Sequence, residues 1–415
     1  MITITRIMKF RDYQEEIITK GTDVIAEHGF VYLAMEVRTG KTLTSMGIAE
    51  RMQMKSMLFI TKKKAITSIE SDYQMYGPSF DIQVINYESL HKIEGTFDII
   101  VLDEAHGMGA FPKPSKRSKQ VKILIQKNDP LVILLSGTPT PESYSQMYHQ
   151  IYSIPGNPFK KYKNFYRFCD DHVNVTQRPI NGLYIKDYSK GRATIMDAMQ
   201  PYFISFSQKE AGFKVETTEN IMHVKMSNIT HNIARQLKKN LVVEGKQEVI
   251  LADSPVKLMG KLHQIYSGTV KFESGASTIL DFTKAEFIKD QFKGKKIGIF
   301  YKFKEELNAL KEVFQDNLTA DLKEFVNTGK NIALQIVSGR EGISLRQAEC
   351  LVYYNIDFSA TSYWQSRDRM TTKERLKNDV YWIFSQGGIE DDIYKAVINK
   401  KDYTLNHFKK DLLNL

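Results

Sequence analysis

The stretch VYLAMEVRTGKT, residues 31–42, decides how this chain is interpreted. Its first five residues are an unbroken apolar run, which predicts a strand buried on both faces of a parallel sheet. The residues after the run, which include Gly40, Lys41 and Thr42, precede a helical stretch, and this is the context of a phosphate-binding loop. In such a loop, backbone N–H groups at the start of the helix bind phosphate oxygens, the lysine reaches the β- and γ-phosphates, and the hydroxyl binds Mg²⁺. Met35 stands where the usual pattern has its first glycine, so a chance Gly-Lys-Thr in a turn stays open at this point.

Apolar runs of the same kind recur along the chain and predict further buried strands. In the first 140 residues the segments between them are long enough for crossover helices, which favours a doubly wound α/β lobe. Residues 144–215 are rich in Tyr, Phe and Lys and predict a mostly helical elaboration. We therefore expect a first lobe over 1–143, this elaboration over 144–215 and a second α/β lobe over 216–415. The runs lie at 31–35, 56–60, 82–86, 97–103 and 131–136, and again at 297–301, 332–337, 350–355 and 380–384.

An acidic pair follows the run at 97–102, in the stretch Asp103-Glu104-Ala105-His106. Two carboxylates at the end of a buried strand are costly unless they bind something. Beside a phosphate loop, Asp103 is placed to hold Mg²⁺ and Glu104 to orient and deprotonate an attacking water. The alternative, that the acidic pair is a simple helix cap, is weak beside a phosphate loop. After the next run, Ser136-Gly137-Thr138-Pro139 places hydroxyl groups in a tight turn, which alone indicates no more than a turn.

Composition limits the class of protein. The chain has 415 residues, 58 Lys+Arg against 48 Asp+Glu, and a net charge of +10, which favours a polyanionic partner without identifying it. A hydrophobic content of 42% excludes global disorder. The cysteines, Cys169 and Cys350, provide no disulfide framework and fit a reducing compartment. Cys169 and His172 have metal-like spacing, but a packed cysteine beside a surface histidine is the better interpretation, since no second pair accompanies them. No apolar run approaches the ~18 residues of a membrane span, and charges occur too early for a signal peptide.

Gly-Lys-Thr, Asp-Glu-Ala-His and Ser-Gly-Thr-Pro, in this order, are the motif series of superfamily 2 helicases and translocases. The chain resembles that family over roughly residues 9–400, and the stretch 113–119 and the closing segment GGIEDDIYKAVINKK are similar to its Swi/Snf-like branch. Other segments resemble further motifs of the family: 11–14, 58–73, 85–90, 338–345 and 354–369. The resemblance implies two RecA-like lobes, ATP and Mg²⁺ as cofactors, and DNA as the partner, contacted through its backbone with little sequence specificity.

The resemblance also implies roles for individual residues, each placed where this sequence matches a motif. Lys41, Glu104 and Arg369 would be catalytic, with Arg369 as an arginine finger, and Thr42 and Asp103 would hold the metal. The ATP-binding residues would be Arg11, Gln14, Arg38, Thr39, Gly40, Lys41, Thr42, Asp103, Gly342 and Arg369. His106, Ser136, Thr138 and Gln365 would couple hydrolysis to movement. The DNA-binding residues would be Lys62, Lys63, Lys64, Lys116 and Arg117.

The sequence departs from the family in two places. The connection between the helix that ends near Asp316 and the strand at Ile332 is short, so the second lobe is trimmed. The motif around Arg369 normally supplies a second arginine, and Thr372 stands at that position. The resemblance thus supports ATP binding better than it supports rapid turnover.

We expect a DNA-dependent ATPase motor, either a helicase or a duplex-tracking translocase, in a minimal form without accessory domains. We expect it to be a monomer in a bacterial or phage-infected cytoplasm, with no membrane association. Two alternatives stay open: a weakly hydrolysing nucleic-acid binding protein on the same fold, and an RNA helicase. Stretch 113–119 argues against the RNA helicase.

Overall fold

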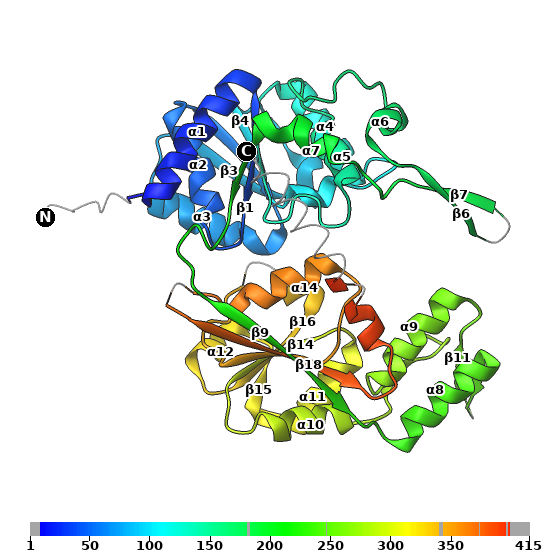
Figure 1. Ribbon diagram of the computed structural model, residues 1–415. Helices are drawn as coiled ribbons and strands as arrows, with labels where there is room; N and C mark the ends of the chain where they lie inside the picture. The colour runs from blue at the N-terminus through cyan, green and yellow to red at the C-terminus, as the bar shows by residue number, and fades with distance from the viewer. Residues whose placement is uncertain are drawn as a thin grey trace, which may run out of the picture. The chain divides into compact units, whose positions relative to one another are not determined.

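The computed structural model describes residues 9–398 except 181, 182, 246, 340–342, 373 and 396. The chain divides into two compact units, of which the first ends at Gly212 and the second covers Phe213–Asn399. Each unit contains its own six-stranded sheet (Figure 1). The domain boundary that the sequence predicts, between residues 215 and 216, stays a prediction.

Unit 1 is built on a sheet of six parallel strands in the order β3-β2-β4-β5-β1-β8. All five apolar runs of the first 140 residues form strands of this sheet, and helices connect several of them. The elements are α1 Asp12–His28, β1 Phe30–Met35, α2 Lys41–Arg51, β2 Ser56–Thr61, α3 Ile66–Tyr76, β3 Asp81–Asn86, β4 Ile99–Leu102, α4 Lys116–Asn128, β5 Leu131–Leu135, α5 Met147–Ile151, α6 Phe165–His172, β6 Thr176–Ile180, β7 Leu183–Asp187, α7 Thr194–Met199 and β8 Phe203–Phe206.

The central strands of unit 1 are buried on both faces, because alternate residues pack into two separate cores. Val31 and Leu33 of β1 pack with residues of α1, α2 and α3, whereas Tyr32 packs with residues of α4 to α7 on the opposite face. Apolar residues at every position of a strand are needed only when helices cover both faces. The predicted doubly wound architecture is therefore confirmed for this unit.

Residues 144–215 contain the short helices α5, α6 and α7 and also three strands. Strands β6 and β7 form an antiparallel hairpin, which extends away from the helices in Figure 1. Strand β8 pairs in parallel with β1, beside the phosphate loop. The elaboration thus contributes an edge strand to the sheet, which its aromatic and basic composition did not indicate.

Unit 2 has a second sheet of six parallel strands in the order β15-β16-β14-β17-β18-β9. Its two faces again pack into two cores, one with α10 and α11 and the other with α12 and α14. The elements are β9 Glu216–Val224, α8 Asn228–Asn240, β10 Val242–Glu244, β11 Val249–Leu251, α9 Pro255–Tyr266, β12 Thr269–Lys271, β13 Ser277–Ile279, α10 Thr283–Gln291, β14 Ile297–Tyr301, α11 Lys304–Phe314, β15 Leu318–Thr319, α12 Leu322–Asn327, β16 Asn331–Gln335, α13 Ile336–Gly339, β17 Cys350–Tyr353, α14 Ala360–Arg367 and β18 Lys377–Ser385. The predicted class, two doubly wound parallel-sheet lobes of the RecA type, is confirmed.

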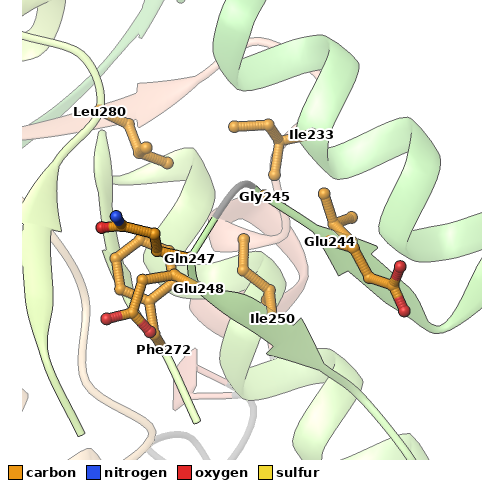
Figure 2. A pocket seen from close by; sticks show the side chains of 9 residues that line it. Ile233, Glu244, Gly245, Gln247, Glu248, Ile250, Phe272 and Leu280 are labelled. Carbon is orange, nitrogen blue, oxygen red and sulfur yellow. The ribbon is translucent and has the colours of Figure 1, made fainter. Parts of the chain in front are cut away.

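Helices α8 and α9 and the hairpins β10–β11 and β12–β13 form a small layer of unit 2 with a core of its own. This layer contains a cavity of about 510 Å³ lined mainly by apolar side chains, among them Ile233, Ile250 and Phe272 (Figure 2). None of the residues with a predicted role lines it. Among the described residues, no helix combines the length and the apolar character that a membrane crossing needs.

Candidate nucleotide-binding site

The phosphate loop of the sequence is a tight turn between β1 and α2. Gly40 has a φ of 89° and Arg38 a φ of 65°, so the loop turns sharply at two residues. Helix α2 begins at Lys41 with no side-chain cap and no acidic residue in its first turn. The first N–H groups of a helix lack intrahelical acceptors and carry a partial positive charge. The start of α2 is therefore suited to bind an anion.

Lys41 lies against the loop that it follows. Its Nζ atom donates hydrogen bonds to the carbonyl oxygens of Met35, at 3.0 Å, and Glu36, at 3.4 Å. The ammonium group is thus held over the loop, where a phosphate bound by the loop would meet it.

The start of α1 supports the loop from one side. The side chain of Gln14 donates from Nε2 to the carbonyl oxygen of Gly40 at 3.4 Å, and the hydroxyl of Tyr13 donates to the carbonyl oxygen of Thr39 at 3.1 Å. Arg11 donates in turn to the Tyr13 hydroxyl at 2.7 Å. A Cβ atom at Gly40 would lie only 2.5 Å from Gln14 Nε2, so a side chain there would displace the Gln14 amide. The structure therefore brings Arg11 and Gln14 to the loop, together with Tyr13, which sequence analysis did not single out.

A second support comes from the segment after β8. The backbone N–H of Gln208 donates to Glu36 Oε2 at 2.7 Å, and Gln208 Nε2 donates to the carbonyl oxygen of Val37 at 3.0 Å. The ring of Phe206 stacks on Tyr13, with centroids 4.6 Å apart. Sequence analysis missed Glu36 and Gln208, because they lie 172 positions apart and neither belongs to a periodic pattern.

Asp103 lies at the carboxyl end of β4, next to the end of β2. Thr61, the last residue of β2, donates its hydroxyl to Asp103 Oδ2 at 2.7 Å. Burial raises the pKa of Asp103 to about 6, and the Glu104 carboxylate acts in the same direction, whereas the Thr61 hydrogen bond and the Lys41 ammonium oppose the rise. A buried carboxylate beside a second carboxylate favours a bound cation, which stabilises its ionised form.

Glu104 and His106 connect the acidic pair to the turn after β5. Nδ1 of His106 lies 3.3 Å from Glu104 Oε2 and 2.9 Å from the hydroxyl oxygen of Ser136. That hydroxyl oxygen also accepts a hydrogen bond from the backbone N–H of Thr138 at 3.1 Å. Three of the predicted coupling residues, His106, Ser136 and Thr138, are therefore connected to one another and to Glu104.

The predicted DNA-binding residues lie in two places of unit 1. Lys62, Lys63 and Lys64 follow the carboxyl end of β2, and the last two are exposed. Lys116 begins α4 and is also exposed. Arg117 instead forms an ion pair with Glu88 at 2.5 Å and lies over the ring of Tyr87 at 5.3 Å.

Tyr87 in turn donates its hydroxyl to the carbonyl oxygen of Asp103 at 2.7 Å. The start of α4 is thus attached to the carboxyl ends of β3 and β4. A DNA contact by Arg117 would compete with its Glu88 ion pair.

The predicted residues of unit 2 are only partly described. Gly342 lies outside the described residues, and so does the side chain of Gln365, which falls in α14. Arg369 is described: its guanidinium donates to the carbonyl oxygen of Ile343 at 3.3 Å. Its neighbour Arg367 forms an ion pair at 3.0 Å with Glu219, a residue of β9 that sequence analysis also missed.

The donor set of unit 1 fits Mg²⁺ and ATP. The Thr42 hydroxyl at the start of α2 and the Asp103 carboxylate at the end of β4 are oxygen ligands of the kind that Mg²⁺ binds. The start of α2 and the Lys41 ammonium provide the donors and positive charge that a polyphosphate needs. No cluster of three or more His, Cys, Asp and Glu side chains suited to a metal occurs among the described residues. Cys169 is buried, as expected, whereas the histidine expected at the surface, His172, is half-buried and bonds to Tyr162 and Thr194.

A tight turn before a helix and an acidic pair, both at the carboxyl edge of a doubly wound sheet, are typical of a nucleoside triphosphate-binding lobe. The chain belongs to the SNF2-related family, because the family model of the SNF2-related domain matches residues 33–282, more than half of its length. Membership of this family implies ATP hydrolysis in general.

Comparison with curated protein sequences gives no significant match. Similar solved structures include the Sulfolobus solfataricus SWI2/SNF2 ATPase core in complex with dsDNA, at 15% identity and a TM-score of 0.43, covering 96% of this chain and 93% of that chain. They also include the Sulfolobus solfataricus SWI2/SNF2 ATPase core domain, at 16% identity and a TM-score of 0.41, covering 95% and 89%.

Proposed function

We propose that this protein is a DNA-dependent ATPase motor that couples ATP hydrolysis to movement on DNA or remodelling of DNA. The observation that carries the proposal is the joint geometry of the phosphate loop, the acidic pair and the His106–Ser136 connection in a member of the SNF2-related family. Exposed lysines after β2 and at the start of α4 support a polyanionic partner.

In the proposed reaction each residue of unit 1 has one task. The start of α2 and Lys41 bind the phosphates and offset their charge. Mg²⁺ held by Thr42 and Asp103 would neutralise charge on the β- and γ-phosphate oxygens. Glu104 accepts a proton from the attacking water, and its contact with His106 fixes the position of its carboxylate. From its match to the family motif, Arg369 is proposed to supply further positive charge to the γ-phosphate as hydrolysis proceeds.

The connection from Glu104 through His106 to Ser136 and Thr138 also supports coupling. A change in the charge of Glu104 during turnover alters the hydrogen bonding of His106 and hence of the turn after β5. We propose that this turn transmits the state of the nucleotide to the surface that binds DNA. We also propose that the protein acts as a monomer in a bacterial or phage-infected cytoplasm. Light scattering of the purified protein would show a dimer if the proposed monomeric state is wrong.

The test is the rate of phosphate release from ATP, measured with single-stranded, duplex, forked and branched DNA and with RNA as a control. We expect DNA to raise the rate, the preferred form of DNA to identify the track, and Lys41→Ala to abolish the release. A rate that DNA leaves unchanged would favour the weakly hydrolysing binding protein. Stimulation by RNA alone would favour the RNA helicase.

A further inference from the structure

The β6–β7 hairpin is firmly attached to unit 1 at its base. Val173 pairs with Gly191, the backbone N–H of Asn174 donates to the carbonyl oxygen of Lys190 at 2.9 Å, and the backbone N–H of Arg192 donates to the carbonyl oxygen of His172 at 2.8 Å. Val173 is buried in the core of the unit. The hairpin therefore leaves the body of unit 1 in a defined direction.

Beyond this base, large side chains of the hairpin are exposed. Tyr184 of β7 is 74% exposed, the highest value among the large apolar and aromatic side chains that the structure describes. Ile185 is 50% exposed and Val175 is 40% exposed. Figure 1 shows the two strands extending past α5 and α6. An isolated two-stranded ribbon is only marginally stable in water, so a surface of this kind is best explained by a partner that covers it.

The two faces of strand β7 differ in chemistry. Side chains alternate between the faces of a strand, so Tyr184 and Lys186 share one face, and Lys186 lies opposite Gln177. Ile185 and Asp187 share the other face. One face thus combines an exposed aromatic ring with an ammonium group, and the acidic side chain of β7 lies on the opposite face.

This combination fits one class of partner. An exposed aromatic ring can stack on any unpaired base, and a neighbouring lysine can contact the backbone phosphate. The segment 173–192 contains four basic residues and one acidic residue, so its charge is complementary to a polyanion and not to another copy of this basic protein. Bases of intact duplex are stacked on one another and offer no free face to Tyr184. The preferred partner is therefore a single-stranded stretch of DNA.

We propose that the Tyr184–Lys186 face of the β6–β7 hairpin binds unpaired bases of DNA, through stacking on Tyr184 and a phosphate contact of Lys186. This inference rests on the proposed function and deepens it, because it selects DNA with single-stranded segments as the substrate class. It assigns to the hairpin a contact separate from the lysines at 62–64 and from Lys116.

The test measures the affinity of the full-length protein for labelled single-stranded, forked and duplex DNA by fluorescence anisotropy, at two or more salt concentrations. We expect Tyr184→Ala to weaken single-stranded and forked binding by about tenfold and duplex binding by less than twofold. Tyr184→Trp should restore the affinity, because it keeps an aromatic face. Lys186→Ala should lower the salt slope for single strands by about 0.7. The matched control is Ile185→Ala, which removes an exposed side chain of the same strand from the opposite face and should change no affinity.

Several results would overturn the inference. Equal effects of Tyr184→Ala and Ile185→Ala would show that stacking is not involved, and an equal loss on duplex would show that unpaired bases are not the target. Unchanged DNA binding together with loss of self-association in Tyr184→Ala would assign the hairpin to a protein contact. The proposed function fails separately: wild-type protein that binds no DNA would refute both, whereas DNA-stimulated hydrolysis with an unaltered Tyr184→Ala affinity would refute the hairpin contact alone.

Discussion

Glu104 is held in an uncommon backbone conformation at the centre of the candidate site. Its φ is 50°, in the left-handed region that side chains other than glycine rarely adopt. Such a conformation costs on the order of 1 kcal/mol and persists where the surroundings enforce it. Here the Asp103 backbone is bonded to Tyr87 and the Glu104 carboxylate contacts His106. The conformation therefore directs the carboxylate away from the strand and toward the turn after β5.

Glu104→Gln should trap bound ATP. The amide keeps the size of the side chain but cannot take a proton from water, whereas nucleotide binding depends on Lys41 and the metal ligands. We expect turnover to fall at least about a hundredfold with ATP affinity nearly unchanged, measured by single-turnover hydrolysis and by nucleotide titration. Wild-type turnover in this variant would show that the role assigned to Glu104 is wrong.

Arg369→Ala should lower turnover by on the order of a thousandfold with a much smaller loss of ATP binding. A guanidinium is always charged and can bind phosphate oxygens through two N–H groups. Arg367 serves as a contrast, because its ion pair with Glu219 stabilises unit 2. Arg367→Ala should therefore lower the thermal unfolding midpoint.

Lys373 is the basic residue that follows Thr372, where the family has its second arginine. If Arg369 acts alone, Lys373→Ala should have little effect on kcat. A severe defect in Lys373→Ala beside a mild one in Arg369→Ala would show that the motif is assigned to the wrong residues.

At the scale of elements, the segment after β8 connects the phosphate loop to the chain entering unit 2. Ser207 and Glu210 form a reciprocal cap: the Ser207 N–H donates to Glu210 Oε2 at 2.6 Å, and the Glu210 N–H donates to the Ser207 hydroxyl oxygen at 3.2 Å. This arrangement stabilises a turn and leaves the next N–H, that of Gln208, for another acceptor. Glu36 of the phosphate loop is that acceptor. The loop is therefore held by a turn that ends at Gly212, the last residue of unit 1 before the chain continues into unit 2.

Gln208→Ala should weaken ATP binding through this support. Loss of the hydrogen bond to the Val37 carbonyl leaves the loop less ordered before ATP binds, and a neutral hydrogen bond contributes about 0.5–1.5 kcal/mol. We expect KM for ATP to rise about two- to tenfold with kcat changed less. Lys209→Ala is the matched control, because Lys209 is exposed in the same turn and makes neither of the two hydrogen bonds that Gln208 makes to Glu36 and Val37. Equal KM values for the two variants would contradict the prediction.

At the scale of the whole molecule, the net charge of +10 predicts how DNA binding depends on salt. Contacts to phosphates release condensed counterions, so the logarithm of affinity should fall linearly with the logarithm of salt concentration, by about 0.7–0.9 for each phosphate neutralised. Titration of DNA into the protein at several salt concentrations measures this slope.

Substitutions at the five predicted DNA-contact residues measure how much each residue contributes to that slope. Lys63→Ala and Lys116→Ala, both at exposed side chains, should each lower it by about one, whereas Lys20→Ala, an exposed lysine of α1, should not. A flat salt response, or strong preference for one base sequence, would contradict the expected backbone binding.

The sequence alone predicted the strands that form the middle of both sheets, the phosphate loop and the acidic pair. All nine apolar runs coincide with strands. Eight of these strands lie inside the sheets, where a strand buried on both faces must be apolar at nearly every position, whereas the ninth, β3, lies at a sheet edge and is partly exposed. The sequence did not predict β8 and β9, which lie at sheet edges. The burial of β9 changes from residue to residue. An edge strand has one neighbour and a partly exposed face, so its composition carries a weaker signal.

Only the tertiary structure decided which polar groups support the site. Thr61 meets Asp103 because β2 and β4 are adjacent and end at the same edge. Gln208 meets Glu36 across 172 positions because β8 pairs with β1, and Arg367 meets Glu219 across 148 positions because β9 lies at the edge of the second sheet. A motif is a local pattern and is visible along the chain. These contacts depend on the order of the strands in each sheet. Parallel strands are joined by long crossover connections, so no single segment of the sequence encodes that order.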